Sequence, residues 1–124
     1  MEIYAIDHVQ LAMPQGGEKE ARQFYGNILG LAEVSKPPQL AMRGGCWFEG
    51  NGVKVHVGVE VNFSPSRKAH PAFLVRNLNL LQEKLLKAGY KISPSEPIEG
   101  YLRIDTSDPF GNRIELMESL ARVA

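Results

Sequence analysis

The feature of this sequence that most constrains its fold is an internal repeat. The segment "DHVQLAM" near the start is matched in type by "AHPAFLV" in the second half, which aligns His8 with His70. Four positions after the glycine of "NGVKVH" stands His56, and four positions after the glycine of "FGNRIE" stands Glu115. Side chains of the types that bind metal ions therefore recur at matching positions. The repeat predicts a duplicated fold with one site where the two halves face each other.

Length and charge limit the classes of protein to which this chain can belong. A chain of 124 residues has the size of a single domain, here composed of two modules that are each too small to be stable alone. Its 14 basic and 14 acidic residues cancel. This balance excludes the electrostatic patch of a nucleic-acid-binding protein and a polybasic membrane anchor.

The sequence also indicates a compartment. The single cysteine, Cys46, cannot form an internal disulfide, which fits a reducing environment. The start "MEIYAIDHVQ" lacks the basic and long apolar regions of a signal peptide. No apolar stretch approaches the roughly 18 residues that a membrane helix needs. We therefore expect a cytoplasmic protein.

The first half predicts one strand, one helix and three further strands. The apolar residues of the helix follow the spacing of one buried stripe, which comprises Ala21, Phe24, Tyr25, Ile28 and Leu29. Valines alternate with other residues in "VKVHVGVEV", so the valine face is expected against the helix and His56 on the opposite face. The predicted elements are a strand over 4–13, a helix over 18–29, and strands over 32–35, 39–49 and 53–61.

The second half repeats this order after a linker, "NFSPSRK", over 62–68. The first module is expected over about 1–62 and the second over about 69–119. A turn over 107–112, "SDPFGN", precedes the last strand. The predicted elements are a strand over 70–76, a helix over 78–88, and strands over 90–93, 101–106 and 113–117. Each half therefore has the order βαβββ, and the fold class is α+β.

A tandem βαβββ unit that starts with "DHVQLAM" and ends with "DPFGNRIELME" resembles the vicinal oxygen chelate (VOC) superfamily. This superfamily includes glyoxalase I, extradiol dioxygenases, fosfomycin-resistance thiol transferases and bleomycin-resistance proteins. The closing string is similar to the D-P-x-G-N-x-[IL]-E-[LIF] ending common there, and the resemblance covers essentially the whole chain, 1–124, as one domain. It implies the glyoxalase/bleomycin-resistance/dioxygenase fold, in which two modules form a cup-shaped mixed sheet around a divalent metal ion.

The resemblance also implies the metal ligands. His8 matches the ligand of the first strand, His70 its counterpart in the second module, and Glu115 the carboxylate of the final strand. Two histidines and one carboxylate with open positions suit divalent Fe, Mn, Zn or Ni. His56 lies near the position of a fourth ligand, although Lys54, two residues earlier on the same face, could be the equivalent residue instead.

The same residues have ordinary interpretations. A strand histidine is most often a polar residue with a backbone partner. Glu115 could pair with Arg113 or Arg103, as in a relative that has lost its metal and only binds. Arg43 and Arg103 could clamp an anionic group of a substrate, or could form surface ion pairs.

Aromatic residues supply a second set of pocket candidates. Trp47, Phe48, Tyr101 and Phe110 could line the cup as a wall for substrate. Strands favour aromatic side chains for packing alone, so we expect about half of the four in the core.

We expect a glyoxalase-like metalloenzyme that acts on a small oxygen-bearing substrate, with Glu115 as the catalytic base. The resemblance leaves lyase or isomerase chemistry, thiol transfer and dioxygenation open. The alternative is a non-catalytic small-molecule-binding protein of the bleomycin-resistance type, although those proteins generally lack the metal ligands that this chain retains. Short members of the superfamily commonly form dimers, so we expect a homodimer with no nucleic-acid or membrane partner.

Overall fold

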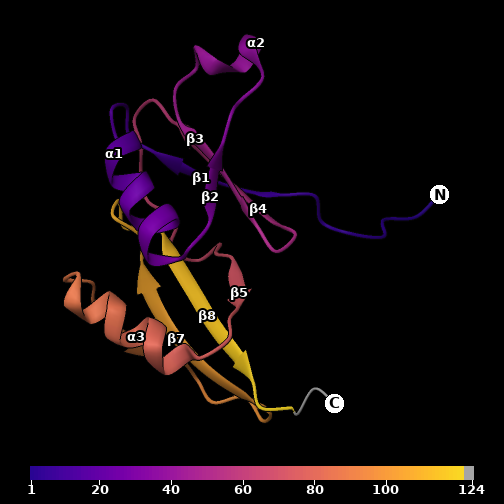
Figure 1. Cartoon of the computed structure of the whole chain (residues 1–124), viewed down its shortest axis with the longest axis vertical. Coiled ribbons are helices and arrows are strands. Elements are labelled where there is room, and N and C mark those ends of the chain that lie inside the picture. The colour runs from indigo at the N-terminus through magenta and orange to yellow at the C-terminus, as the bar shows by residue number, and fades with distance from the viewer. Residues whose placement is uncertain (122–124) are drawn as a thin grey trace. The chain divides into compact units, whose positions relative to one another are not determined.

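A computed structural model describes residues 1–121. The chain divides into two compact units, Met1–Ser64 and Pro65–Ala124, and each contains one four-stranded sheet (Figure 1). The boundary lies within the linker predicted over 62–68. In the described part of the chain, no helix has the length and apolar character needed to cross a membrane.

The first unit contains four strands and one long helical segment. Its sheet has the strand order β1-β4-β3-β2, in which β1 and β4 are parallel and the other neighbours are antiparallel. The elements in chain order are β1 (Val9–Met13), α1 (Glu18–Ala21), η1 (Arg22–Ile28), β2 (Ala32–Val34), α2 (Pro38–Ala41), β3 (Cys46–Gly50) and β4 (Val53–Val59).

The second unit repeats this topology. Its sheet has the order β5-β8-β7-β6, again with a parallel first pair and antiparallel neighbours after it. The elements are β5 (Ala72–Leu74), α3 (Leu78–Lys87), β6 (Ser93–Pro94), β7 (Tyr101–Ser107) and β8 (Arg113–Ser119). The prediction of two βαβββ modules in an α+β fold is therefore confirmed, with α2 as an addition to the first module.

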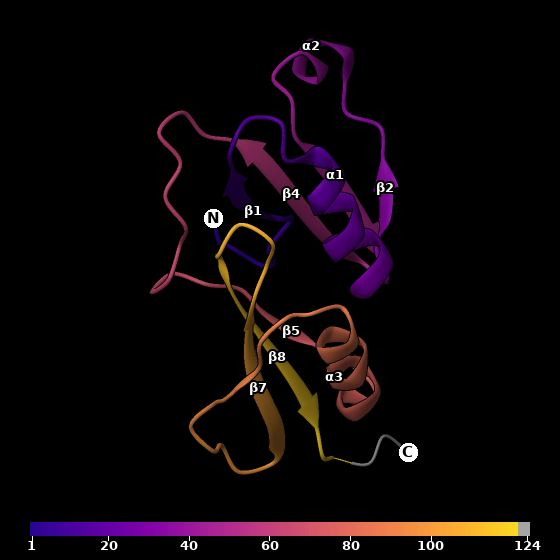
Figure 2. The ribbon, with the colours of Figure 1, turned by 90° about the vertical axis from the view of Figure 1, so that its left-hand side faces the viewer.

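The predicted helix over 18–29 forms, and it buries the first part of the predicted stripe, whereas Ile28 and Leu29 are only half-buried. Phe24 and Tyr25 are fully buried, as is Phe48 of β3, whose ring lies 5.7 Å from that of Tyr25. Complete burial of such a side chain stabilises the fold by about 1.5–3 kcal/mol. The helix differs from the expectation in its second part, η1, which is a π-helix, and the N–H of Leu29 accordingly donates to the carbonyl of Phe24. Figure 2 shows α1 lying against one face of the first sheet.

The strand predicted over 39–49 is wrong in its first part. Proline at the first position of a helix is pre-organised for helical backbone, and Pro38 begins the short helix α2. Gly44 and Gly45 then have φ angles of +75° and +85°, which interrupt an extended chain. The strand therefore starts only at Cys46, and the N–H of Gly45 donates to Glu18 Oε2 at 2.9 Å.

Other predicted strands are also shorter than expected, among them β2, β5 and β6. The strand predicted over 4–13 begins at Val9, and residues 1–8 are exposed and belong to no strand. On β4 the valine face is buried only at its centre, where Val55 and Val57 are 0% and 1% exposed, whereas Val53 is 39% exposed. The alternation was predicted correctly, but the valine face is not buried along its whole length.

In the second unit, α3 packs on the sheet through Leu78 and Leu85, both buried. Its first turn is fixed by a side chain of the sheet, because the carboxylate of Glu118 accepts hydrogen bonds from the N–H groups of Asn77 and Leu78. The side chain of Asn77 caps the helix by accepting a hydrogen bond from the N–H of Leu80. These bonds satisfy donors that a helix cannot satisfy internally.

The "DPFGN" string forms a fixed turn between β7 and β8. Asp108 Oδ1 accepts from the N–H groups of Phe110 and Asn112, and its Oδ2 accepts from Asn112 Nδ2, all at 2.9 Å. Asn112 Oδ1 in turn accepts from the N–H of Ser66, while the N–H of Arg113 donates to the carbonyl of Ser66. The turn thus anchors the segment that leads to His70 alongside β8.

Candidate functional site

Strand pairing supports the alignment of the two halves. Gln10 lies opposite His56 in the first sheet, and Ala72 lies opposite Glu115 in the second. His8 and His70 each stand two residues before the first member of these pairs. His56 rather than Lys54 is therefore the structural equivalent of Glu115.

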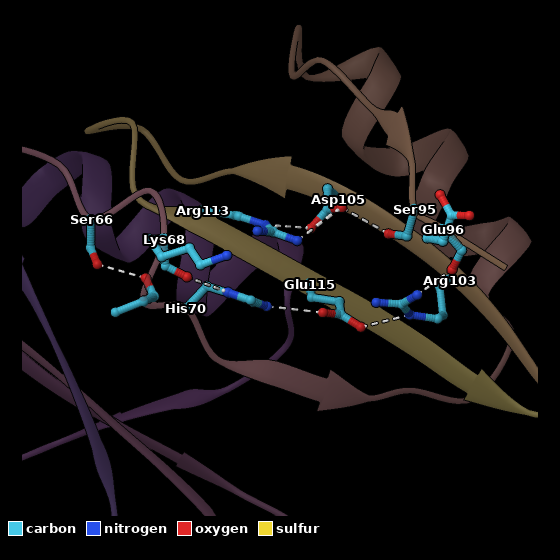
Figure 3. Close-up of polar contacts among 10 residues, drawn as sticks. Ser66, Lys68, His70, Ser95, Glu96, Arg103, Asp105, Arg113 and Glu115 are labelled. Carbon is cyan, nitrogen blue, oxygen red and sulfur yellow. Dashed lines mark hydrogen bonds and ion pairs between the residues drawn. The ribbon is translucent and has the colours of Figure 1, made fainter. Parts of the chain in front are cut away.

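The second unit brings two predicted ligands together (Figure 3). His70 Nε2 lies 3.0 Å from Glu115 Oε1, and His70 Nδ1 lies 2.8 Å from the backbone carbonyl oxygen of Lys68. A carbonyl oxygen only accepts, so Nδ1 bears a hydrogen and Nε2 is the nitrogen available to a proton or a metal ion. The contact at Nδ1 is also what the ordinary interpretation of His70 predicted, namely a strand histidine with a backbone partner.

Glu115 is held at its other oxygen by an arginine. Arg103 Nε donates to Glu115 Oε2 at 2.8 Å, and Nη1 of Arg103 donates to the carbonyl oxygen of Glu96. The pKa of Glu115 lies below its ordinary value because Arg103 stabilises the carboxylate, while burial opposes this and the hydrogen bond to His70 assists it. The pair that the ordinary interpretation expected, Glu115 with Arg103, is thus present.

A second carboxylate lies directly across the strand pair from the first. Asp105 is the cross-strand neighbour of Glu115. Burial acts to raise the pKa of Asp105, but hydrogen bonds from Arg113 Nε at 2.9 Å and from Ser95 Oγ at 2.8 Å outweigh it, and the pKa is lowered. Each carboxylate therefore has its own arginine, which removes the repulsion between two adjacent negative charges.

In the first unit the corresponding face contains stacked rings. The ring of His56 lies between that of His8, at 4.2 Å between centroids, and that of Trp47, at 3.9 Å and nearly parallel. His56 is 8% exposed, and its pKa is lowered because burial disfavours the charged ring and because His8 lies against it. His8 Nδ1 lies 2.9 Å from Asp7 Oδ2. The contact with Asp7 therefore involves Nδ1 and leaves Nε2 as the other ring nitrogen of His8.

The structure distributes the predicted pocket residues unevenly. Trp47 stacks on His56, and Arg103 binds Glu115. Arg43 lies in the exposed turn after α2 rather than in a strand, and Tyr101 is 37% exposed at the start of β7. Phe48 is buried in the core, which agrees with the expectation that about half of the four aromatic candidates would lie there.

Sequence reasoning did not single out Asp7 or Asp105. Asp7 precedes His8 directly, and a carboxylate beside a ligand-type histidine is a recognisable orienting partner. Asp105 was detectable by folding the predicted hairpin about the "DPFGN" turn, which places it opposite Glu115. Finding it required the strand register in addition to the pattern of each strand.

The four predicted ligands occur as two pairs, His8 with His56 and His70 with Glu115. Across residues 1–121, no group of three or more His, Cys, Asp or Glu side chains is arranged to hold a metal ion. The donor chemistry of the second pair nevertheless fits a cation. Adjacent ligands of an octahedral ion with bonds of about 2.1 Å lie about 3 Å apart, which is the separation of His70 Nε2 and Glu115 Oε1. A histidine that donates its other N–H to a backbone carbonyl is typical of metal ligands.

Comparison with known proteins extends over nearly the whole chain. Residues 5–116 match the family model described as the Glyoxalase/Bleomycin resistance protein/Dioxygenase superfamily. A crystal structure of a putative glyoxalase family protein from Bacillus anthracis is 46% identical, with a TM-score of 0.90, over 96% of this chain and 98% of that one. No curated protein matches the chain.

More distant structures share the fold. A glyoxalase/dioxygenase from Nostoc punctiforme is 22% identical, with a TM-score of 0.76, over 93% of this chain and 90% of that one. The fosfomycin resistance protein FosX from Listeria monocytogenes is 16% identical, with a TM-score of 0.72, over 99% of this chain and 97% of that one. At these identities the similarity bears on the fold alone.

Proposed function

The chain belongs to the glyoxalase/bleomycin resistance protein/dioxygenase superfamily, and from this premise we propose that it is a metal-dependent enzyme acting on a small oxygen-bearing substrate. His8, His70 and Glu115 are the proposed ligands of a divalent Zn, Ni, Mn or Fe ion. The observation that supports this most is the 3.0 Å separation of His70 Nε2 and Glu115 Oε1, with His70 Nδ1 already bonded to a carbonyl oxygen. The two modules form one domain in this proposal.

The proposed role of the histidines is to present one nitrogen each. Asp7 binds His8 at Nδ1, and the carbonyl oxygen of Lys68 binds His70 at Nδ1. Both contacts leave Nε2 as the donor atom and restrain the rotation of the ring. When bound, a divalent ion supplies Lewis-acid stabilisation to negative charge on substrate oxygens.

Glu115 is the proposed base as well as a ligand. Its lowered pKa keeps the carboxylate ionised at neutral pH, and an ionised carboxylate whose Oε1 is not bound to the metal ion can accept a proton there. The resulting reaction class, whether lyase or isomerase chemistry, thiol transfer or dioxygenation, depends on the substrate.

The remaining predicted site residues form the proposed surroundings of the metal. His56 is a candidate fourth ligand through a nitrogen at the edge of its stacked ring, and Trp47 is a candidate wall for substrate. Tyr101, Arg43 and Arg103 are the other proposed pocket residues. Arg103 can reach an anionic substrate only by sharing its guanidinium with Glu115.

A homodimer in the cytoplasm is part of the proposal. Large apolar side chains are exposed in the first residues of the chain: Ile3 is 96%, Tyr4 is 92% and Ile6 is 86% exposed. Apolar surface of this kind favours burial against another subunit.

A second candidate function is binding without catalysis, as in resistance proteins of the superfamily. It is favoured by the saturation of Glu115, because both of its carboxylate oxygens already have partners in His70 and Arg103. A carboxylate that is satisfied in this way does not require a cation.

Metal analysis distinguishes the two functions. For protein purified without chelator, we expect about one divalent ion per chain, and we expect His70→Ala and Glu115→Ala to lose it. Glu83→Ala, on the exposed surface of α3, is the matched control and should retain the ion. Metal-free wild-type protein that binds a small aromatic ligand as tightly as Glu115→Ala does would instead establish the binding protein.

A further inference from the structure

The two oxygens of Glu115 have partners of different kinds. Oε1 lies against His70, and Oε2 accepts from Arg103 Nε. The side chains of Glu115 and Arg103 are 7% and 13% exposed, so water cannot readily replace this contact. Arg103 is itself anchored, because its Nη1 donates to the carbonyl oxygen of Glu96 (Figure 3). The guanidinium therefore defines the orientation of the carboxylate.

The internal repeat supports a link between this arginine and this carboxylate. Trp47 lies opposite His56 in the first sheet, and Asp105 lies opposite Glu115 in the second. Two residues before these cross-strand partners stand Gly45 and Arg103. The first unit, with the neutral ring of His56 on its last strand, thus has a glycine at this position. The second unit, with the carboxylate of Glu115 on its last strand, has an arginine there.

Glycine at that position has its own structural reason. A side chain at Gly45 would place its Cβ 2.3 Å from the carbonyl oxygen of Val57, so the first unit excludes any side chain there. In the second unit the same position admits a long, charged side chain that reaches across to β8. The two units therefore differ at this position: Arg103 is present in the unit whose carboxylate, Glu115, needs a positive partner, and Gly45 is present in the unit whose ring, His56, does not.

We propose that Arg103 is a positioning residue, which occupies Oε2 of Glu115 and presents Oε1 alone to a divalent cation held with His70. This inference rests on the proposed metal site and deepens it, because it assigns Glu115 a single donor oxygen. An unrestrained carboxylate can bind a metal ion through one or two oxygens. Occupying Oε2 removes the second mode and keeps one more coordination position for substrate.

Cobalt binding tests the cation part of the proposal. In Arg103→Met we expect Co²⁺ to bind about 10–100-fold more weakly than in the wild type, with a changed Co²⁺ absorption spectrum, because the carboxylate loses its fixed orientation. If Arg103 were only a competing positive charge, its removal would tighten Co²⁺ binding. Tighter or unchanged binding in Arg103→Met would therefore overturn the proposal.

A matched control lies on the same face of the sheet. Arg113 is also an arginine with a carboxylate partner, but its partner is Asp105. We expect Arg113→Met to leave the Co²⁺ spectrum unchanged. An equal change in both variants would overturn the proposal, because it would indicate a general effect of removing charge from this face.

A metal-free measurement separates the positioning role from the proposed function. In chelator-treated protein, ¹⁵N NMR at fixed neutral pH reports the Nε2 atom of His70. Arg103→Met should shift this signal, because Oε1 is no longer held 3.0 Å from Nε2, whereas Arg113→Met should not. If the wild type binds no Co²⁺ but the signal shifts, the metal site is refuted while the positioning of Glu115 by Arg103 stands. An unshifted signal refutes the positioning role.

Arg103→Lys provides a second variant should Arg103→Met fail to fold. Lysine retains the positive charge but lacks the planar fork that binds Glu115 and Glu96 simultaneously. We expect Co²⁺ binding at least about 10-fold weaker than in the wild type, with a normal thermal unfolding curve. Wild-type affinity and spectrum in the lysine variant would overturn the proposal.

Discussion

At matching positions of the two sheets, the first unit has His56 and Trp47 where the second has Glu115 and Asp105. The first pair is uncharged and stacked, and the second is anionic and bound to two arginines. Strand order and register are the same in both units. The comparison teaches that the repeated backbone fixes where side chains stand, while their chemistry decides what must surround them.

The two pairs need different surroundings because burial affects them differently. A neutral imidazole between two rings gains contact area and loses little hydration, so stacking suffices. A carboxylate taken out of water needs opposite charge or several hydrogen-bond donors. In the second unit, four polar side chains accordingly contact the two carboxylates, namely Arg103, Arg113, Ser95 and His70.

The largest effect on stability is expected in the "DPFGN" turn before β8, which has no counterpart of the same sequence in the first unit. Asp108→Ala removes the acceptor of three hydrogen bonds to Phe110 and Asn112, and we expect unfolding free energy to fall by about 3 kcal/mol, since bonds to charged groups contribute about 1.5–3 kcal/mol. Urea unfolding measures this. In the first unit the turn before β4 contains Asn51 with φ +52°, and Asn51→Gly should change stability by less than about 1 kcal/mol. Similar losses in both variants would contradict the comparison.

A difference in pH dependence is the intermediate effect. The pKa of His56 lies below its ordinary 6.5 in the folded chain because of burial, so the unfolded chain binds the proton more readily. The stability that neutral His56 contributes is complete above pH 6.5 and is lost as pH falls from there through the folded pKa. His56→Phe keeps a ring between His8 and Trp47 but cannot titrate. In metal-free protein, the loss of stability below pH 6.5 should be smaller in this variant than in the wild type.

Glu115 acts in a more acidic range. Its folded pKa lies below the ordinary 4.5 because of Arg103, so its contribution is complete above pH 4.5 and is lost as pH falls through the folded pKa. Glu115→Gln should therefore reduce the acid sensitivity below pH 4.5 and leave the range near pH 6 unchanged. Urea midpoints measured below pH 4.5 and near pH 6 check this prediction. A change in the midpoint of Glu115→Gln near pH 6, with none below pH 4.5, would contradict it.

The smallest effect is expected at the exposed ion pair of the first unit. Arg22 Nε donates to Glu33 Oε1 at 2.8 Å, but the two side chains are 52% and 39% exposed. Solvent screens such a pair, so Arg22→Met should lower stability by no more than about 1 kcal/mol. High salt should weaken the wild-type contribution further. A loss well above this value by thermal unfolding would show that exposure does not govern the ion pairs of this fold.

The order of elements was predictable because it depends on local patterns. Alternating valines indicated β4, and the stripe containing Phe24 and Tyr25 indicated the helix that packs on Phe48. The helix α2 was missed because the pattern predicted one continuous strand over 39–49, whereas the positive φ angles of Gly44 and Gly45 end the extended backbone there. The π-helical part of the first helix has no local sequence signal that we recognise.

The candidate site was predictable only in part. The pairing of Glu115 with Arg103 was one of the alternatives open from the sequence, and the stack of His8, His56 and Trp47 was not foreseen. His56 was identified as a candidate ligand because of its place in the repeat. Its ring faces are occupied by neighbours whose positions depend on the pairing of β3 with β4 and of β1 with β4.

The sequence by itself determined the duplication, the βαβββ order of each half and the matching positions of His8 with His70 and His56 with Glu115, because periodicity and turn residues act over a few neighbours. Only the tertiary structure decided which side chains meet. Arg103 reaches Glu115, and Trp47 covers His56, through strand registers that join residues far apart in the chain. Register is set by the packing of whole sheets, and a single strand pattern does not contain it.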